Sequence, residues 1–220
     1  MPEILKSFVR RSGRIGPGQK RHLKETLPKI EIPFSDSPID LNVAFGRAHS
    51  KIMEIGFGMG EATAQMAAES PDVDFWCLDV HLAGAGALAQ HVAQKDLSNI
   101  RITIFDAVEV LQKMVLPESL NGVNIFFPDP WQKKRHKKRR LIQAPFVELL
   151  VSRLKNGAVL HTATDWEEYA FEMLWVFSKN SHLKNRYTDF APRENRPLSK
   201  FEQRALNLQH GIWDLIFEKK

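Results

Sequence analysis

The chain has 220 residues, 43% hydrophobic and 26% charged, which is enough for one α/β domain with a sizeable core and too short for two full domains. Its net charge of +5 and its pI of about 9.3 favour a polyanionic partner. No apolar stretch approaches the roughly 18 residues that cross a bilayer, and no apolar segment follows the basic N-terminus, so neither a membrane span nor a signal peptide is predicted. The single cysteine, Cys77, cannot form an internal disulfide, and we therefore expect a reducing, cytoplasmic setting.

Residues 1–35 are predicted to form a basic N-terminal arm, because Gly13, Gly16, Pro17 and Gly18 interrupt any long element. One domain is predicted over residues 36–220. Its first elements are a strand at 51–55, a helix at 61–69, a buried strand at 73–78, a helix at 82–94 and a strand at 100–105. The rest are a buried strand at 123–127, a helix at 141–154 that stops at Asn156-Gly157, a strand at 158–163, a helix at 166–178, a short helix near 201–208 and a strand at 212–217. This alternation predicts an α/β fold, with a mostly parallel central sheet and helices on both faces.

A glycine-rich turn follows the first predicted strand. Gly56, Gly58 and Gly60 let the backbone bend tightly and let a ligand approach it, with a helix N-terminus behind. The spacing is G-x-G-x-G rather than G-x-G-x-x-G, and Glu54 stands just before it. A carboxylate at that position suits a ligand that carries a cationic amine or a sulfonium better than it suits a pyrophosphate. The alternative is a turn with a purely structural role.

An acid also follows each of the next two predicted strands. Asp79 ends the second strand, where an acid accepts hydrogen bonds from ribose hydroxyls, and Asp106 follows the third, within reach of an adenine amino group. Either could be an ordinary helix cap, but together with Glu54 they describe a pocket for an adenosine-bearing cation. This arrangement resembles that of the Rossmann-like class I methyltransferases, and the implied ligand is S-adenosyl-L-methionine (SAM).

The fourth predicted strand ends in Phe-Phe-Pro-Asp-Pro-Trp, residues 126–131. This segment resembles, without matching, the motif of methyltransferases that act on exocyclic amino groups of DNA bases. Its prolines restrict the backbone and would aim Asp129 at the mouth of the pocket. A rigid turn with an exposed acid is the alternative interpretation.

Two clusters of cations stand out in the sequence. One follows the Pro-Asp-Pro segment and contains Lys133, Lys134, Arg135, Lys137, Lys138, Arg139 and Arg140. The other lies in the N-terminal arm and contains Lys6, Arg10, Arg11, Arg14, Lys20, Arg21 and Lys24. Each cluster alone is explained by a solvated surface, but two in one small basic chain favour a nucleic acid as partner.

Residues 128–140, 106–111, 164–167, 199–204 and 211–215 together resemble the bacterial tRNA (guanine-N7)-methyltransferase family, and the resemblance runs from about residue 7 to 217. It implies tRNA as the substrate, with guanine 46 of the variable loop as the target. It also implies that Glu54, Asp79, Asp106 and Asp129 line the cofactor site and that Asp129 is catalytic. Contacts to the tRNA or to the target base are implied for Lys133, Asp165, Ser199, Lys200, Phe201 and Glu202.

Three positions depart from the family pattern, which commonly has Glu at Asp79, His at Gln132 and Thr at Ser199. Asp79 and Ser199 keep the functional group, whereas Gln132 cannot titrate, which argues against an essential proton transfer there. Ser199 and Glu202 also have the spacing of a helix capping box, which gives them a structural alternative.

Contacts to RNA phosphates are predicted for Arg135, Lys137, Lys138, Arg139 and Arg140. No spaced set of Cys and His is present, so we predict no metal site. No obligate protein partner is expected, and the sequence leaves both a monomer and a homodimer open. Three rival functions remain at this point: a nucleotide-dependent oxidoreductase, a non-catalytic RNA-binding module, and a methyltransferase that acts on DNA or on another RNA position.

Overall fold

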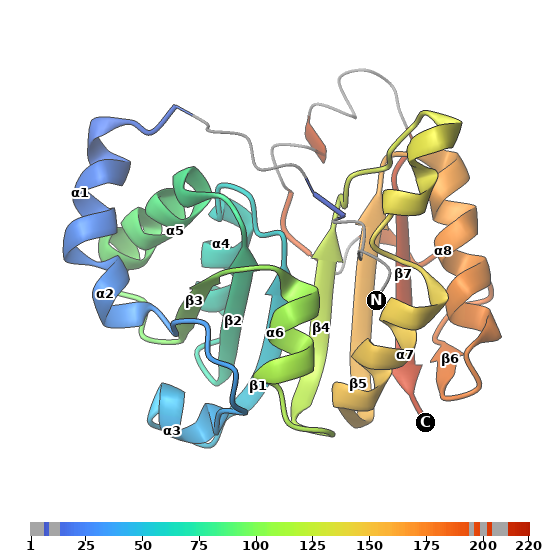
Figure 1. Cartoon of the computed structure of the whole chain (residues 1–220), viewed down its shortest axis with the longest axis horizontal. Coiled ribbons are helices and arrows are strands. Elements are labelled where there is room, and N and C mark those ends of the chain that lie inside the picture. Colours follow the sequence, from blue (N-terminus) through green and yellow to red (C-terminus); the bar gives the residue numbers. More distant parts are fainter. Residues whose placement is uncertain (1–6, 9–13, 194–195, 199–201, 204–210) are drawn as a thin grey trace.

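The computed structural model describes residues 7–8, 14–193, 196–198, 202–203 and 211–220, which build a seven-stranded sheet with helices on both faces (Figure 1). The strand order is β3-β2-β1-β4-β5-β7-β6. Strands β1 to β5 pair in parallel, while β7 runs antiparallel to both β5 and β6. The strands are β1 (Ser50–Ile55), β2 (Val73–Asp79), β3 (Ile100–Ile104), β4 (Leu120–Phe126), β5 (Leu154–Thr164), β6 (Leu183–Asn185) and β7 (Trp213–Lys219). The predicted fold class is therefore confirmed.

Most predicted elements are confirmed within one to three residues. The helices are α1 (Pro17–Glu25), α2 (Leu27–Ile30), α3 (Leu41–Phe45), α4 (Glu61–Glu69), α5 (Leu82–Lys95), α6 (Ala107–Lys113), α7 (Ala144–Arg153) and α8 (Glu167–Lys179), together with the 3₁₀ helix η1 (Lys134–Arg139). Sequence reasoning missed α3, α6 and β6, which are all short. The helix predicted near 201–208 falls almost wholly outside the described residues.

The helix predicted over residues 141–154 does not stop at Asn156-Gly157 as expected. Helix α7 ends at Arg153, and the Asn-Gly pair lies inside β5. The register between β4 and β5 shifts there, because Leu120 pairs with Leu154 and Gly122 with Val159, so β5 carries extra residues. Gly157 absorbs this irregularity with a φ of 78°.

Two short helices that were not predicted, α1 and α2, lie within residues 1–35. Helix α1 begins at Pro17, which is favourable at a first helical position, and packs on α5 (Figure 1). The Gln19 side chain donates to the Ala83 carbonyl at 3.3 Å, and a Cβ at Gly86 would stand 3.0 Å from Gln19. Helix α1 of the predicted arm is thus packed against helix α5 of the domain, and the domain boundary at residue 35 stays a prediction.

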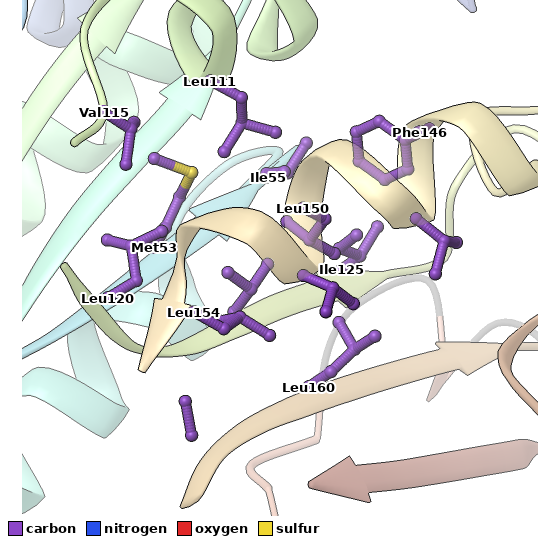
Figure 2. Packing of buried hydrophobic residues seen from close by; sticks show 14 of the residues in the cluster. Met53, Ile55, Leu111, Val115, Leu120, Ile125, Phe146, Leu150, Leu154 and Leu160 are labelled. Carbon is purple, nitrogen blue, oxygen red and sulfur yellow. The ribbon is translucent and has the colours of Figure 1, made fainter. Parts of the chain in front are cut away.

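Two hydrophobic clusters cover the two faces of the sheet. In β2, Trp76 and Leu78 belong to one cluster and Phe75 and Cys77 to the other, as the alternation of a strand requires. The larger cluster joins β1, β4 and β5 to α6, α7 and α8, and Figure 2 shows its centre around Ile125. The smaller cluster joins β2 and β3 to α2, α4 and α5. With both faces covered, the strand ends are left as the place for a site.

Candidate active site

A cavity of about 290 Å³ opens at the carboxyl ends of β1, β2 and β4, beside the point where the strand order reverses. This is where open α/β sheets bind their ligands, and small-molecule pockets start at about 300 Å³. The structure brings all the predicted cofactor residues to this cavity. They are Glu54, Gly56, Gly58, Gly60, Asp79, Asp106 and Asp129.

Glu54 is the deepest acid of the cavity and is 3% exposed. Burial raises the pKa of this carboxyl to about 7, and the negative charge of Asp79 adds to the rise, while the Thr63 hydroxyl opposes it. Its Oε2 has no hydrogen-bond partner within the described part of the chain. A buried oxygen without a partner is costly, and a cationic ligand would satisfy it.

Asp79 organises the glycine turn from the end of β2. Its carboxylate accepts hydrogen bonds from the backbone N–H groups of Gly58 at 3.2 Å, Val80 at 2.7 Å and His81 at 3.0 Å. Burial raises its pKa, and these hydrogen bonds, with His81 nearby, hold the rise in check. Asp79 therefore couples the second strand to the turn after the first.

The glycine turn also depends on Gly84, which sequence reasoning did not single out. A Cβ at Gly84 would stand 2.2 Å from the Gly58 carbonyl oxygen, so α5 and the turn touch through backbone alone. Gly58 and Gly60 have φ values of 59° and 77°, in the left-handed region that favours glycine. Glycine inside a helix is unfavourable, and that signal could have marked Gly84 as a close contact.

Asp106 caps a helix at the edge of the cavity. It is the N-cap of α6, and its carboxylate accepts a hydrogen bond from the Val108 N–H at 2.9 Å. The structural alternative noted for this residue is therefore real. Because the side chain also lines the cavity, capping and ligand binding are compatible at this position.

Residues 127–131, here called the proline segment, carry an unusual backbone. Phe127 has a φ of 52° and Trp131 a φ of 43°, in the left-handed region that bulky residues rarely adopt. Between them lie Pro128 and Pro130, whose rings restrict the chain further. Asp129, at the centre, is exposed and lines the cavity. Such strain is typical of functional sites.

The N-terminal residues Ser7 and Phe8 also line the cavity, which sequence reasoning did not predict. The Trp131 indole N–H donates to the Ser7 carbonyl at 3.0 Å. On its other side, Trp131 meets the Arg139 guanidinium at 5.1 Å from the ring centre. Trp131 thus links the proline segment, the N-terminus and the basic run.

The basic run forms η1 directly after the proline segment, at the same edge of the sheet as the tip of β4 (Figure 1). Its exposed cations are Lys133, Lys134, Arg135 and Lys138. Lys137, which was also predicted to contact RNA, is half-buried and pairs with Glu168, so its charge is already engaged. The run therefore presents a cationic surface directly after the proline segment, although none of its residues lines the cavity.

Arg140 departs from the prediction that it contacts RNA. It is 1% exposed, its Nε–H donates to the Pro130 carbonyl at 2.8 Å, and its guanidinium pairs with Glu172. A buried guanidinium that is engaged in this way cannot reach a phosphate. We therefore remove Arg140 from the RNA-contacting set.

Glu202 departs from its predicted role as well. It is 0% exposed and pairs with Arg196 at 2.6 Å and with Arg193. A buried, doubly paired carboxylate does not face a substrate. Asp165 is half-buried just after β5 and is not among the residues that line the cavity. The predicted contacts Ser199, Lys200 and Phe201 lie outside the described residues.

Within the described ranges, no group of three or more His, Cys, Asp or Glu side chains is arranged to hold a metal ion. A search of the same ranges finds no helix long and apolar enough to span a bilayer.

Comparison with known proteins decides the family. A family profile described as "Putative methyltransferase" matches residues 48–215. A tRNA (guanine-N(7)-)-methyltransferase of Aromatoleum aromaticum is 55% identical over 217 residues, 98% of this chain and 84% of that protein. A protein of the same name from Dechloromonas aromatica is 52% identical over 217 residues, 98% of this chain and 88% of that protein. This chain belongs to the tRNA (guanine-N7)-methyltransferase family.

The fold of the enzyme is shared with distant methyltransferases. A 16S rRNA (adenine(1408)-N(1))-methyltransferase of Catenulisporales acidiphilia, solved with the cosubstrate SAM, superposes with a TM-score of 0.55 at 16% identity, over 83% of this chain and 92% of that one. The fold is thus the Rossmann-like fold of class I methyltransferases. Membership of the tRNA (guanine-N7)-methyltransferase family removes the rival interpretation as a nucleotide-dependent oxidoreductase.

Proposed function

We propose that the enzyme transfers a methyl group from SAM to N7 of guanine 46 in the variable loop of tRNA. The observation that carries this proposal is the meeting of Glu54, Asp79, Asp106 and Asp129 at one cavity, with a cationic helix a few residues after Asp129 in the chain. The guanine target follows from the family, and position 46 is what the family resemblance implies. Because tRNA is the substrate, we place the reaction in the cytoplasm.

The donor set fits SAM. Glu54 is a buried carboxylate whose Oε2 has no hydrogen-bond partner among the described residues, which suits a ligand with an ammonium and a sulfonium. Asp79 would hold the ribose hydroxyls and Asp106 the adenine amino group. Gly56, Gly58 and Gly60 would let the ligand lie against the backbone. When bound, SAM supplies an electrophilic methyl carbon.

The chain's own part in the reaction is chiefly alignment. Guanine N7 has a free lone pair, so it needs no deprotonation before the N7–methyl bond forms and the sulfur–methyl bond breaks. The purine gains positive charge in this step. Asp129 would accept hydrogen bonds from guanine N1–H and N2–H₂ and favour the base more as it becomes cationic. Asp165 would assist in orienting the base.

The cations of the basic run would hold the RNA backbone. Phosphate contacts from Lys133, Lys134, Arg135, Lys138 and Arg139 give affinity and register but little sequence information. The base itself must be presented outside a stacked helix, which a loop nucleotide allows. A tRNA variable loop fits both requirements.

We expect tRNA binding to depend steeply on salt. With about five phosphate contacts, log affinity should fall against log salt with a slope of roughly −3.5 to −4.5. Replacing Lys134 and Arg135 together by Ala should make the slope shallower by roughly 1.4 to 1.8, measured by filter binding across salt concentrations. The matched control replaces Lys95 and Lys155, exposed cations at the opposite edge of the sheet, and should leave the slope unchanged. Equal slopes for both double variants would contradict the proposed RNA surface.

The product tests the proposed function directly. The enzyme is incubated with unmodified tRNA and SAM labelled in its methyl group, and the labelled nucleoside is then identified and mapped. We expect N7-methylguanosine at position 46, and no label in a transcript whose guanine 46 is replaced by adenine. A different methylated nucleoside, or label at another guanine, would overturn the proposal while leaving the family membership intact.

A further inference from the structure

The strained proline segment needs to be held in place, because nothing in its own sequence favours the left-handed conformations of Phe127 and Trp131. Aromatic residues keep such conformations where the surrounding structure leaves no alternative. Two arginines from outside the segment, Arg140 and Arg196, make contacts of this kind. Both are buried, although neither lines the cavity.

Arg140 holds the C-terminal half of the segment. Its Nε–H donates to the Pro130 carbonyl at 2.8 Å, and its Nη1 pairs with Glu172 and lies 3.4 Å from Glu168. The guanidinium also lies 4.7 Å from the centre of the Tyr169 ring. All three partners belong to α8, so Arg140 ties the backbone of the proline segment to a helix of the core.

Arg196 holds the N-terminal half. Its guanidinium carbon lies 5.3 Å from the ring centre of Phe126 and 5.2 Å from that of Phe127. Its Nε–H and Nη2–H donate to the two carboxylate oxygens of Asp214 in β7, at 2.8 and 3.0 Å, and its Nη1–H donates to Glu202 at 2.6 Å. Hydrogen bonds on three of its nitrogens fix the plane of the guanidinium against the two aromatic rings.

Asp214, the partner of Arg196 in β7, is itself held in place by a neighbouring strand. Asp214 accepts a further hydrogen bond from His161 of β5 at 2.8 Å. Burial alone would raise the pKa of Asp214, but the hydrogen bonds and charges of His161 and Arg196 hold it below its usual value. Asp214 is therefore an ionised partner at neutral pH, and the group forms a bridge from the β5–β7 pair to the end of β4.

We propose that Arg140 and Arg196 are positioning residues. They contact the two ends of the proline segment and thereby hold Asp129 at the cavity. This inference rests on the proposed role of Asp129. It gives both arginines a task that does not involve RNA, although Arg140 stands in the cationic run. It also explains why Glu202 is buried, since its carboxylate accepts a hydrogen bond from the Arg196 guanidinium and helps to fix its orientation.

The test uses Arg140→Lys and Arg196→Lys in the full-length enzyme. Lysine keeps the charge, and so the buried ion pairs, but it cannot donate in several fixed directions in one plane. Since a displacement of about 1 Å can lower a rate by about 100-fold, we expect kcat to fall at least about tenfold in each variant. Dissociation constants for SAM and for tRNA should stay within about twofold, because neither arginine lines the cofactor cavity or the RNA surface.

The matched control is Lys51→Arg, the reverse exchange in another buried ion pair. Lys51 is 3% exposed and pairs with Asp74 at 2.9 Å at the opposite end of β1. Its melting temperature should fall while kcat stays as in the wild type. If a lysine variant does not fold, Glu172→Gln and Glu202→Gln replace it. Each removes one carboxylate partner of Arg140 or Arg196 and leaves the other in place. Both variants should lower kcat in the same way.

The outcomes separate this inference from the function on which it rests. Loss of kcat in both arginine variants and in Asp129→Asn, with both affinities kept, supports it. Wild-type kcat in the arginine variants beside an inactive Asp129→Asn overturns the positioning role and leaves the proposed function standing. A fall in kcat that Lys51→Arg shares equally overturns it too. If Asp129→Asn is active, the role of Asp129 fails, and the positioning role fails with it.

Discussion

Replacing Asp129 by Asn is expected to lower kcat by about 100-fold or more, because an amide cannot accept both guanine N–H groups or stabilise the charge that develops on the base. The dissociation constant for SAM should change by less than about fivefold, since four other acids line the cavity. Single-turnover methylation of tRNA and calorimetric titration with SAM measure the two effects separately.

Two further variants serve as a control and as a comparison for Asp129→Asn. Asp72→Asn changes an exposed acid in the turn before β2 and should behave as the wild type. Asp165→Asn should lower kcat by less than Asp129→Asn, because Asp165 follows the carboxyl end of β5 and does not line the cavity. Turnover close to the wild-type value in Asp129→Asn would remove this residue from the mechanism.

Replacing Glu54 by Gln is expected to have opposite effects on cofactor affinity and on stability. Affinity for SAM should fall by about 100-fold, because the ligand's positive charge loses a buried partner. The ligand-free protein should become more stable at pH 8, since the wild type must keep a carboxylate ionised in a dry site. With a pKa of about 7 against an ordinary value of 4.5, the stabilisation should approach roughly 3 kcal/mol.

The pH dependence follows from the direction of this shift. Between pH 4.5 and about 7 the unfolded chain has lost the Glu54 proton while the folded chain keeps it, so wild-type stability falls as pH rises through this window. The gain in Glu54→Gln should grow over the same range and level off above it. SAM binding by the wild type should weaken by up to about tenfold per pH unit below 7, because the ionised form binds.

Melting temperatures and SAM titrations from pH 5 to 8 measure both effects, with Glu69→Gln on α4 as a control that should follow the wild type. A Glu54→Gln protein that binds SAM as the wild type does would show that Glu54 is not the partner of the ligand's charge. A variant less stable than the wild type at pH 8 would contradict the cost assigned to the buried carboxylate.

The sequence was sufficient for the main elements, because each depends on a local pattern. The apolar run of β2 and the Ala-rich face of α4 carry their own periodicity, and both were located within a residue. Local sequence patterns gave the wrong element, or none, where pairing between strands determined the structure. Asn156-Gly157 has the composition of a helix stop, but the ladder between β4 and β5 includes it as an irregularity. The three-residue strand β6 exists because β7 is there to pair with it.

The acids and glycines of the proposed cofactor site were predictable from the sequence, since the carboxyl ends of neighbouring parallel strands meet at one edge of the sheet, and all of these residues line one cavity. Which charges of the basic run face solvent depends on the packing of distant elements. Arg139 and Arg140 are chemically alike in sequence, yet the second turns inward because Glu168 and Glu172 of α8 lie beneath it. The surroundings of Asp129 depend in the same way on residues far along the chain. No local pattern predicts that Asp214 and Glu202 will orient Arg196 against the ring of Phe127 in the proline segment.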